Sequence, residues 1–61
     1  MLYVVYLNNK GFICTFNKLA NSYTTTQDID DADFNNALEV AQSTAEFFGG
    51  IVLTFKVWIT Q

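Results

Sequence analysis

A strict alternation of side chains over residues 51–60 constrains the fold of this chain more than any other feature. A period of two is typical of a β-strand that buries one face and leaves the other in water. The first face consists of Ile51, Leu53, Phe55, Val57 and Ile59. The second face consists of Val52, Thr54, Lys56, Trp58 and Thr60. We expect the first set to face the core, so the chain must contain a sheet with something packed on one side.

The second face carries the only tryptophan of the chain, Trp58, where a solvated side chain would be expected. If the first face packs against a helix, Trp58 and Val52 lie on the far side of the sheet, because one helix covers only one face. One side of residues 2–7 would join them, either Leu2, Val4 and Tyr6 or Tyr3, Val5 and Leu7. Monomers rarely expose such a cluster unless it binds something. We therefore expect Trp58 to be buried by a second chain.

Residues 2–7 and 12–16 are predicted to form a hairpin. The sequence LYVVYL at 2–7 is apolar on both faces and rich in β-branched and aromatic residues, which is typical of a strand covered on both sides. The turn between the strands ends in Gly11, and it suits a type I turn followed by a bulge with Gly11 in the left-handed conformation.

The polar stretch 17–30 is predicted to be a long loop. Its SYTTT segment has strand propensity, so a short edge strand within it is an open alternative. A second alternative is that Leu19 and Tyr23 fold over the far face of the sheet and cover it. Connections of this length are uncommon in compact domains and often functional, which makes this one a candidate contact loop.

Residues 36–48 are predicted to form an amphipathic helix. Its apolar stripe follows helical spacing and consists of Phe34, Ala37, Leu38, Ala41, Ala45 and Phe48. Asn36 and Glu39 suit a capping box, although a start at residue 31 is also open. Gly49 supplies the left-handed residue that ends a helix, and Gly50 leads into the final strand.

These elements predict an α+β fold with the order β-β-α-β. The final strand is expected to pair antiparallel with the first, which gives a three-stranded antiparallel sheet in the order 2-1-3 with one helix on one face. That order places residues 2–7 in the centre. The rival, in which the final strand pairs parallel with the second, would leave the most apolar strand at an edge. With 61 residues the chain is expected to be a single domain, 1–61.

The chain has few means of reinforcing so small a core. It has one cysteine, Cys14, and no histidine, so neither an internal disulfide nor a zinc site can be built. Cys14 lies between Phe12 and Phe16 and is expected to be a small core residue. A hydrophobic fraction of 51% supplies material for an efficient core or for oligomerisation, and a homodimer is the expected state.

Composition also excludes several classes of function. Without histidine the usual nucleophile–base pairs cannot form, and no cofactor motif is present, so we expect neither enzymatic activity nor a cofactor. A net charge of −3 and the absence of arginine argue against direct nucleic-acid binding. No apolar run approaches the roughly 18 residues of a membrane span. The expected setting is the cytoplasm, without membrane contact.

Four aspartates crowd before the predicted helix: Asp28, Asp30, Asp31 and Asp33. A calcium loop starting at Asp28 would end at Glu39, but Ala32 stands at a ligand position and Asp33 at the glycine position, and no helix precedes them. We expect no metal site. The favoured interpretation is that these acids lie at the positive end of the helix dipole, and the alternative is an acidic docking patch for a basic partner.

From Ala32 onward, ADFNNALEVAQSTAEFFGGIVLTFKV resembles a pattern in short proteins of phages and prophages of Gram-positive bacteria. In that pattern an Ala and a Phe precede a capped helix, which ends in Gly-Gly and a last strand. The matching residues are Ala32, Phe34, Leu38, Glu39, Ala41, Gly49 and Gly50. The resemblance implies a small protein expressed in a bacterial host, of the kind that binds and inhibits a host enzyme or defence complex.

We therefore expect a small non-catalytic protein-binding module, a phage or prophage accessory protein that binds and inhibits a host protein. The alternative is a structural small subunit or a homodimeric assembly protein without an inhibitory role. The residues expected to contact a partner are Trp58, Val52, Tyr3, Tyr6, Tyr23, Asp28, Asp30, Asp31 and Asp33.

Overall fold

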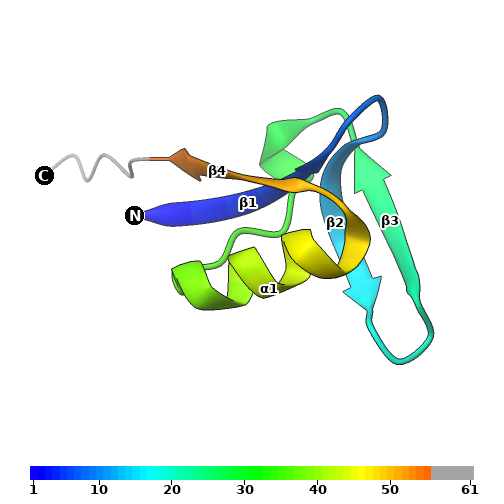
Figure 1. Cartoon of the computed structure of the whole chain (residues 1–61). Helices are drawn as coiled ribbons and strands as arrows, with labels where there is room; N and C mark the ends of the chain where they lie inside the picture. Colours follow the sequence, from blue (N-terminus) through cyan, green and yellow to red (C-terminus); the bar gives the residue numbers. More distant parts are fainter. Residues whose placement is uncertain (56–61) are drawn as a thin grey trace, which may run out of the picture.

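The chain folds as a four-stranded antiparallel sheet with one α-helix against it, in a computed structural model that describes residues 1–55 (Figure 1). The elements are β1 (Leu2–Leu7), β2 (Gly11–Asn17), β3 (Ser22–Thr26), a 3-10 turn η1 (Ile29–Asp31), α1 (Leu38–Phe48) and β4 (Ile51–Phe55). The strand order is β3-β2-β1-β4. The α+β class is as predicted, whereas the prediction of three strands is wrong. Residues 56–60 of the predicted final strand, including Trp58, lie outside the described residues.

β4 lies beside β1 in an unbroken antiparallel register that runs from Tyr6↔Ile51 to Leu2↔Phe55. Since β2 lies on the other side of β1, the predicted order 2-1-3 holds for these three strands. The rival prediction, in which the final strand pairs parallel with β2, is wrong.

A tight turn connects β1 to β2. The Lys10 N–H donates to the Leu7 carbonyl oxygen at 3.0 Å, and Asn9 within this turn has a φ of 65°. A positive φ at the third turn residue is typical of a type II turn, so the predicted type I turn is wrong. Gly11 has the predicted positive φ, 111°, and a Cβ there would lie 2.6 Å from the carbonyl oxygen of Thr26. Glycine is therefore required where β2 begins beside the end of β3.

The edge strand β3 lies where a long loop was predicted. Its sequence SYTTT is rich in β-branched threonines, and this strand propensity decides its structure. β3 pairs antiparallel with β2, with a register shift between Ile13 and Thr15. Cys14 is the extra residue of this bulge and is half-buried, so its prediction as a core residue is wrong. The loop prediction is also wrong, and the alternative of a short edge strand is confirmed.

The two central strands separate soon after their turn, and the linker to the helix fills the space between them. β1 and β2 pair only over the residues next to their turn. Beyond this point the Asp33 N–H donates to the Ile13 carbonyl oxygen at 2.9 Å. Asn35 exchanges two backbone hydrogen bonds with Tyr3, of 2.8 and 2.9 Å. Residues 33–35 therefore connect β1 to β2 where the strands no longer meet.

The helix begins at Leu38, later than either predicted start. Its N-cap is Ala37, whose side chain makes no capping hydrogen bond. Instead, the Oδ1 atom of Asn35 accepts a hydrogen bond from the Ala37 N–H at 2.6 Å. The predicted capping box of Asn36 and Glu39 is therefore wrong.

Small side chains let α1 lie close against the sheet. Ala41, Thr44 and Ala45 are buried, and the Thr44 hydroxyl donates to the Val40 carbonyl oxygen one turn earlier at 3.0 Å. The predicted stripe is correct at Ala41 and Ala45. It is wrong at Leu38, which is 41% exposed.

The face of β4 that meets the helix is the opposite of the predicted one. The core beneath α1 is formed by Val5, Leu7, Ile13 and Ala45, and Val52 packs against this cluster. Ile51 has the opposite orientation and is 58% exposed. The prediction that the face with Ile51, Leu53 and Phe55 packs on the helix is therefore wrong.

The reason for this inversion is the short connection between α1 and β4. Gly49 ends the helix with a φ of 79°, as predicted, and Gly50 then passes directly over β1. A Cβ on Gly50 would lie 2.7 Å from Cδ2 of Leu7 and 3.0 Å from Cγ1 of Val5, so Gly50 is on the core side. Because side chains alternate along a strand, Ile51 then faces outward and the next residue faces the helix.

Candidate functional site

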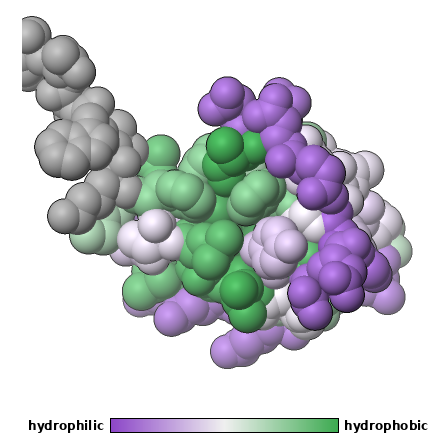
Figure 2. All heavy atoms as spheres, turned by 90° about the horizontal axis from the view of Figure 1, so that it is seen from above, coloured by the Kyte–Doolittle hydropathy of each residue, from purple (hydrophilic) through white to green (hydrophobic). Residues whose placement is uncertain are grey.

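The sheet face turned away from α1 carries a group of apolar side chains, which we call the open face. It consists of Leu2, Val4, Tyr6, Phe12, Ile51, Leu53 and Phe55. Residues paired across antiparallel strands share a face, and the register arranges these side chains in rows. The rows are Phe12–Tyr6–Ile51, Val4–Leu53 and Leu2–Phe55. Figure 2 looks down on this side of the molecule and shows hydrophobic residues gathered in the middle with hydrophilic residues along part of the rim.

Aromatic rings shield part of the open face, and its β4 side is the most exposed. The rings of Tyr6 and Phe12 meet edge to face at a centroid distance of 5.4 Å. Phe34, in the linker before α1, meets Phe55 in the same way at 5.7 Å, so it does not belong to the helix stripe as predicted. Val4 is only 1% exposed, whereas Ile51 on β4 is 58% exposed.

Of the tyrosines predicted to contact a partner, only Tyr6 lies on the open face. Tyr3 has the opposite orientation along β1 and lines a cavity beside α1. Tyr23 packs on the helix side, with its ring 5.2 Å from that of Phe48. Val52 packs against the core. The placement of Val52 on the far face is therefore wrong, and of the two alternatives for β1 the one with Tyr6 is correct and the one with Tyr3 is not, because alternation in the sequence does not say which face meets the helix.

The suggestion that residues 17–27 cover the far face is also wrong. Leu19 is at the tip of the β2–β3 hairpin and is fully exposed, at 101%. Tyr23 points to the helix side, as its contact with Phe48 shows. The open face therefore keeps its exposure at β4 without cover from this hairpin.

The four predicted acidic residues are all exposed and lie in or beside η1: Asp28, Asp30, Asp31 and Asp33. η1 is on the side of the sheet away from α1 (Figure 1). The Oδ1 atom of Asp28 accepts a hydrogen bond from the Asp30 N–H at 3.0 Å and so caps η1. Asp28 caps η1, Asp30 and Asp31 lie within it and Asp33 follows it, whereas the acid in the first turn of α1 is Glu39. The predicted contact of the aspartates with the dipole of the long helix is therefore wrong. Within residues 1–55 no group of three or more His, Cys, Asp or Glu side chains could hold a metal ion.

A second cluster, which we call the aromatic corner, lies between α1 and the β2–β3 hairpin. It consists of Phe16, Tyr23, Phe47 and Phe48. Phe48 is at its centre, with the rings of Phe16, Tyr23 and Phe47 at centroid distances of 6.0, 5.2 and 4.7 Å. Phe47 is 48% exposed and Phe16 is 37% exposed. One signal in the sequence could have found this cluster, since Phe47 does not fit the apolar stripe of the helix.

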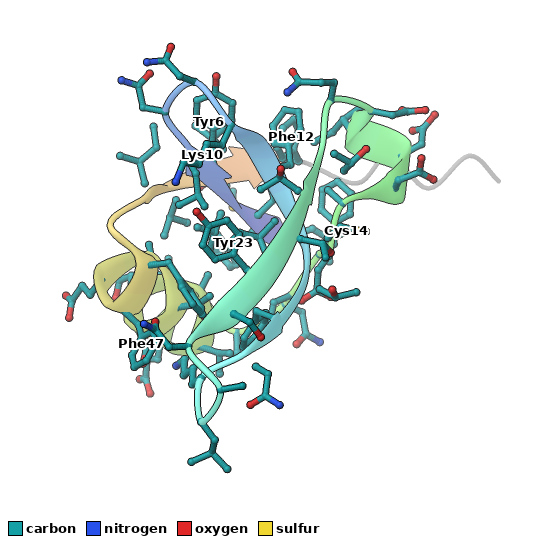
Figure 3. All side chains as sticks on the ribbon, turned by 90° about the vertical axis from the view of Figure 1, so that its right-hand side faces the viewer. Tyr6, Lys10, Phe12, Cys14, Tyr23 and Phe47 are labelled. Atoms are coloured by element: carbon teal, nitrogen blue, oxygen red, sulfur yellow. The ribbon has the colours of Figure 1, made fainter. Side chains whose placement is uncertain are left out.

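Two lysines border the aromatic corner. The Lys10 ammonium donates a hydrogen bond to the Tyr23 hydroxyl at 2.7 Å and reaches toward it across the hairpin (Figure 3). The Lys18 ammonium donates to the Ser43 hydroxyl at 3.0 Å and lies 5.9 Å from the centroid of the Phe47 ring. Within residues 1–55 these two lysines thus place positive charge beside exposed aromatic rings.

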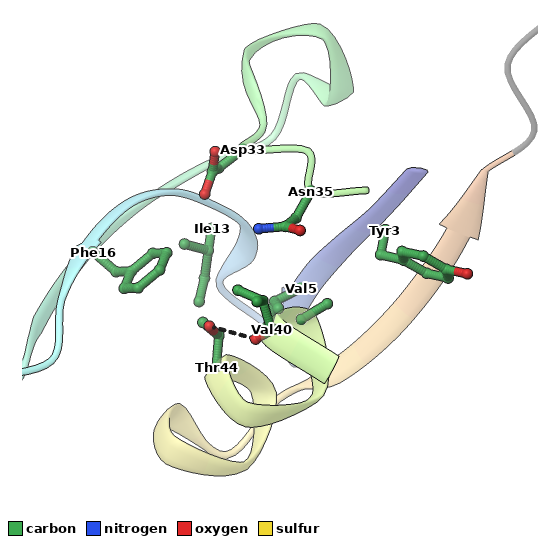
Figure 4. Close-up of a pocket in the computed structure, with 9 residues that line it drawn as sticks. Tyr3, Val5, Ile13, Phe16, Asp33, Asn35, Val40 and Thr44 are labelled. Atoms are coloured by element: carbon green, nitrogen blue, oxygen red, sulfur yellow. Dashed lines mark hydrogen bonds between the residues drawn. The ribbon is translucent and has the colours of Figure 1, made fainter. Parts of the chain in front are cut away.

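Two hollows of different size lie beside α1. A cavity of about 20 Å³ lies beside α1 and is lined by residues that include Tyr3, Ile13, Asn35 and Thr44 (Figure 4). This volume holds little more than one water molecule. A wider open groove of about 410 Å³ runs between α1 and β4.

No helix within residues 1–55 has the length and apolar character needed to cross a lipid bilayer. Comparison of the chain with protein-family models, with curated proteins and with solved structures gives no match.

Proposed function

We propose that this chain is a small non-catalytic protein-binding module that contacts its partner through the open face. The resemblance of its second half to short phage and prophage proteins suggests an accessory protein in the cytoplasm of a bacterial host. In that setting the partner is a host protein, which the module inhibits by occupying part of its surface. The module itself is a homodimer, and neither nucleic acid nor a membrane takes part.

The observation that carries this proposal is the open face itself. Its seven side chains are contiguous over three strands, and none of them is charged. A contiguous apolar patch bordered by polar residues is typical of a protein contact. Tyr6, Phe12 and Phe55 supply the aromatic area that is enriched at interfaces.

The aspartates at η1 support the same assignment. They lie on the side of the sheet that carries the open face, and all four are exposed. Exposed charges at the rim of an interface mainly accelerate association and select the partner. A host protein with a basic rim around an apolar surface would therefore suit this face.

A non-catalytic role is supported by the inventory of side chains. The sequence contains no histidine and one cysteine, so the common acid–base and nucleophilic arrangements are unavailable. The alternative function, a structural subunit or assembly protein, is favoured by one observation: among residues 1–55 no strand pairs with the outer edge of β4.

Capture from a bacterial host lysate tests the proposal. We expect the wild-type protein to retain a specific host protein, identified by mass spectrometry, and the Leu2→Lys variant to lose at least about tenfold in affinity, or 1.4 kcal/mol. Leu2 is at the start of β1 on the open face, so a charge there disturbs the face more than the fold. The control is Leu19→Lys, which adds the same charge at the exposed hairpin tip. Equal capture by both variants, with unchanged melting temperatures, would contradict the proposal.

A further inference from the structure

β4 is an edge strand, and within residues 1–55 its outer side has no partner. The bonds of β1 show which backbone groups point outward. Both the N–H and the C=O of Tyr3 are bonded to Asn35, on the side of β1 away from β4. In an antiparallel ladder a residue directs both groups to one side, and neighbouring residues alternate. Tyr3 therefore makes no bond to Thr54 opposite it, and the outward groups of β4 belong to Thr54 and Val52.

The outer edge of β4 lacks the features that normally prevent pairing with another strand. Edge strands are usually protected by a charged side chain, a proline or a bulge. The sequence of β4 is IVLTF, without charge or proline, and its register with β1 has no shift. Its first residue, Ile51, is 58% exposed. The strand therefore offers a flat and apolar edge.

We propose that two copies of the chain pair antiparallel along β4, around a two-fold axis at Leu53. In this register Val52 of each copy faces Thr54 of the other, and each pair exchanges N–H···O bonds in both directions. On the open face Leu53 meets its own copy and Ile51 meets Phe55 of the second copy. The most exposed side chain of the open face is thus covered by an aromatic ring, and no like charges oppose each other.

The groove beside β4 agrees with an added strand. It is lined by Gln42, Ala45, Glu46, Gly50, Ile51 and Val52, and so follows the strand between its edge and α1. Residues of an added β4 that point toward α1 would be Val52 and Thr54, whose short side chains suit this space. The occupant is a second copy because self-pairing about Leu53 sets Leu53 against Leu53, Ile51 against Phe55 and Val52 against Thr54, so that every cross-strand contact joins uncharged side chains and the apolar ones meet on the same face.

Cross-linking of purified full-length protein tests the register. In a Cys14→Ala background, Leu53→Cys places two thiols opposite each other in a non-hydrogen-bonded pair, where the Cα atoms are about 4.5 Å apart. That separation lies within the range of about 4.4–6.8 Å for a disulfide. We expect rapid formation of a covalent dimer under mild oxidation. Thr54→Cys in the same background is the control and should cross-link much more slowly, because residue 54 faces Val52 of the other copy.

Proline substitutions test the edge independently. Thr54→Pro removes an outward N–H without breaking a bond to β1, so this variant should sediment as a folded monomer at concentrations where the wild type is a dimer. Thr25→Pro is the matched control on β3. The Ile13 carbonyl oxygen accepts from Asp33 on the side of β2 away from β3, so Ile13 makes no backbone hydrogen bond to Thr25, which lies opposite it. Thr25 therefore directs its N–H away from β2, and the Thr25→Pro variant should remain a dimer.

Several results would overturn the proposal: a monomeric wild type, a dimer that survives Thr54→Pro, or faster cross-linking at residue 54 than at residue 53. If both proline variants lose the dimer, the cysteine variants decide, because they leave the backbone unchanged. The inference rests on the homodimer part of the proposed function, but its test uses the purified chain alone. Failure to capture a host protein therefore leaves its outcome unaffected.

Discussion

The two edges of the sheet are built from different kinds of sequence. β3, at one edge, reads SYTTT and is joined to β2 through a bulge. The hydroxyls of Thr15 and Thr24 hydrogen-bond to each other across that pair of strands at 2.6 Å. β4, at the other edge, reads IVLTF and pairs with β1 without a shift. One edge carries hydroxyl side chains that water can hydrate, whereas the other is mostly apolar and exposes Ile51.

The two edges of a small sheet can therefore have separate roles. A bulge hinders the addition of another strand, and β2 carries one where it pairs with β3. β3 is also tied to α1, through the contact of Tyr23 with Phe48. β4 has no such protection, and we infer that its protection comes from a second chain.

The largest effect is expected from a proline in β4 at a position that bonds inward. Leu53 directs its N–H toward Val4, so Leu53→Pro breaks the ladder with the central strand. A domain of this size has only about 0.05–0.15 kcal/mol of stability per residue, and we expect this variant to be unfolded at 25 °C. Circular dichroism should show the loss of structure, while Thr54→Pro keeps a cooperative melt. Equal melts for the two variants would mean that the inward and outward groups of β4 are assigned the wrong way round.

An intermediate effect is expected from truncating Phe48, the helix residue whose ring contacts Tyr23 of β3. Phe48→Ala removes the ring that contacts Phe16, Tyr23 and Phe47, and should lower the free energy of unfolding by about 2–3 kcal/mol, since the side chain is half-buried. Hydrogen exchange should then accelerate more at the amides of β3 than at those of β4. A uniform acceleration would show that the aromatic corner supports the whole domain and not one edge.

The smallest effect is expected from Thr24→Val. The substitution removes one hydroxyl from the bond between Thr15 and Thr24 and should change the free energy of unfolding by less than about 1 kcal/mol. The urea midpoint measures this change. Sedimentation should show no additional association through β3, because the bulge remains. Growth of larger oligomers would instead mean that the hydroxyls alone protect this edge.

The sequence allowed the elements to be predicted, but not the side of the sheet on which the helix lies. The β1–β2 hairpin, the antiparallel pairing of β4 with β1, and Gly49 at the end of the helix were all predicted. The orientation of β4 depends on the close passage of Gly50 over Leu7 and Val5, a contact between segments far apart in the chain. Alternation alone cannot reveal such a contact, and so Val52 was assigned to the wrong face and the side of β1 that carries Tyr3 was left open.

The linker before α1 was misread for a related reason. Phe34 fits helical spacing with Leu38 and Ala41, yet its ring lies against Phe55 on the other side of the sheet. Periodicity could not show that residues 33–35 extend between separating strands. β3 was left open because its threonines favour a strand while its polarity favours a loop. Tyr6 was placed on the far face as one of two alternatives, and only the packing of α1 decided between them.

Because residues 33–35 lie between β1 and β2, β1 can complete its hydrogen bonds only late in the synthesis of the chain. β1 makes hydrogen bonds to its turn neighbours, to Asn35 and to β4, so its partners are spread along nearly the whole described chain. During synthesis β1 emerges first, but most of its partners are added last. Contacts so distant in sequence slow folding. Apart from its pairing with β2 next to the turn, β1 therefore lacks most of its partners until β4 has left the ribosome, and a chaperone that shields residues 2–7 during that interval would raise the yield of folded protein.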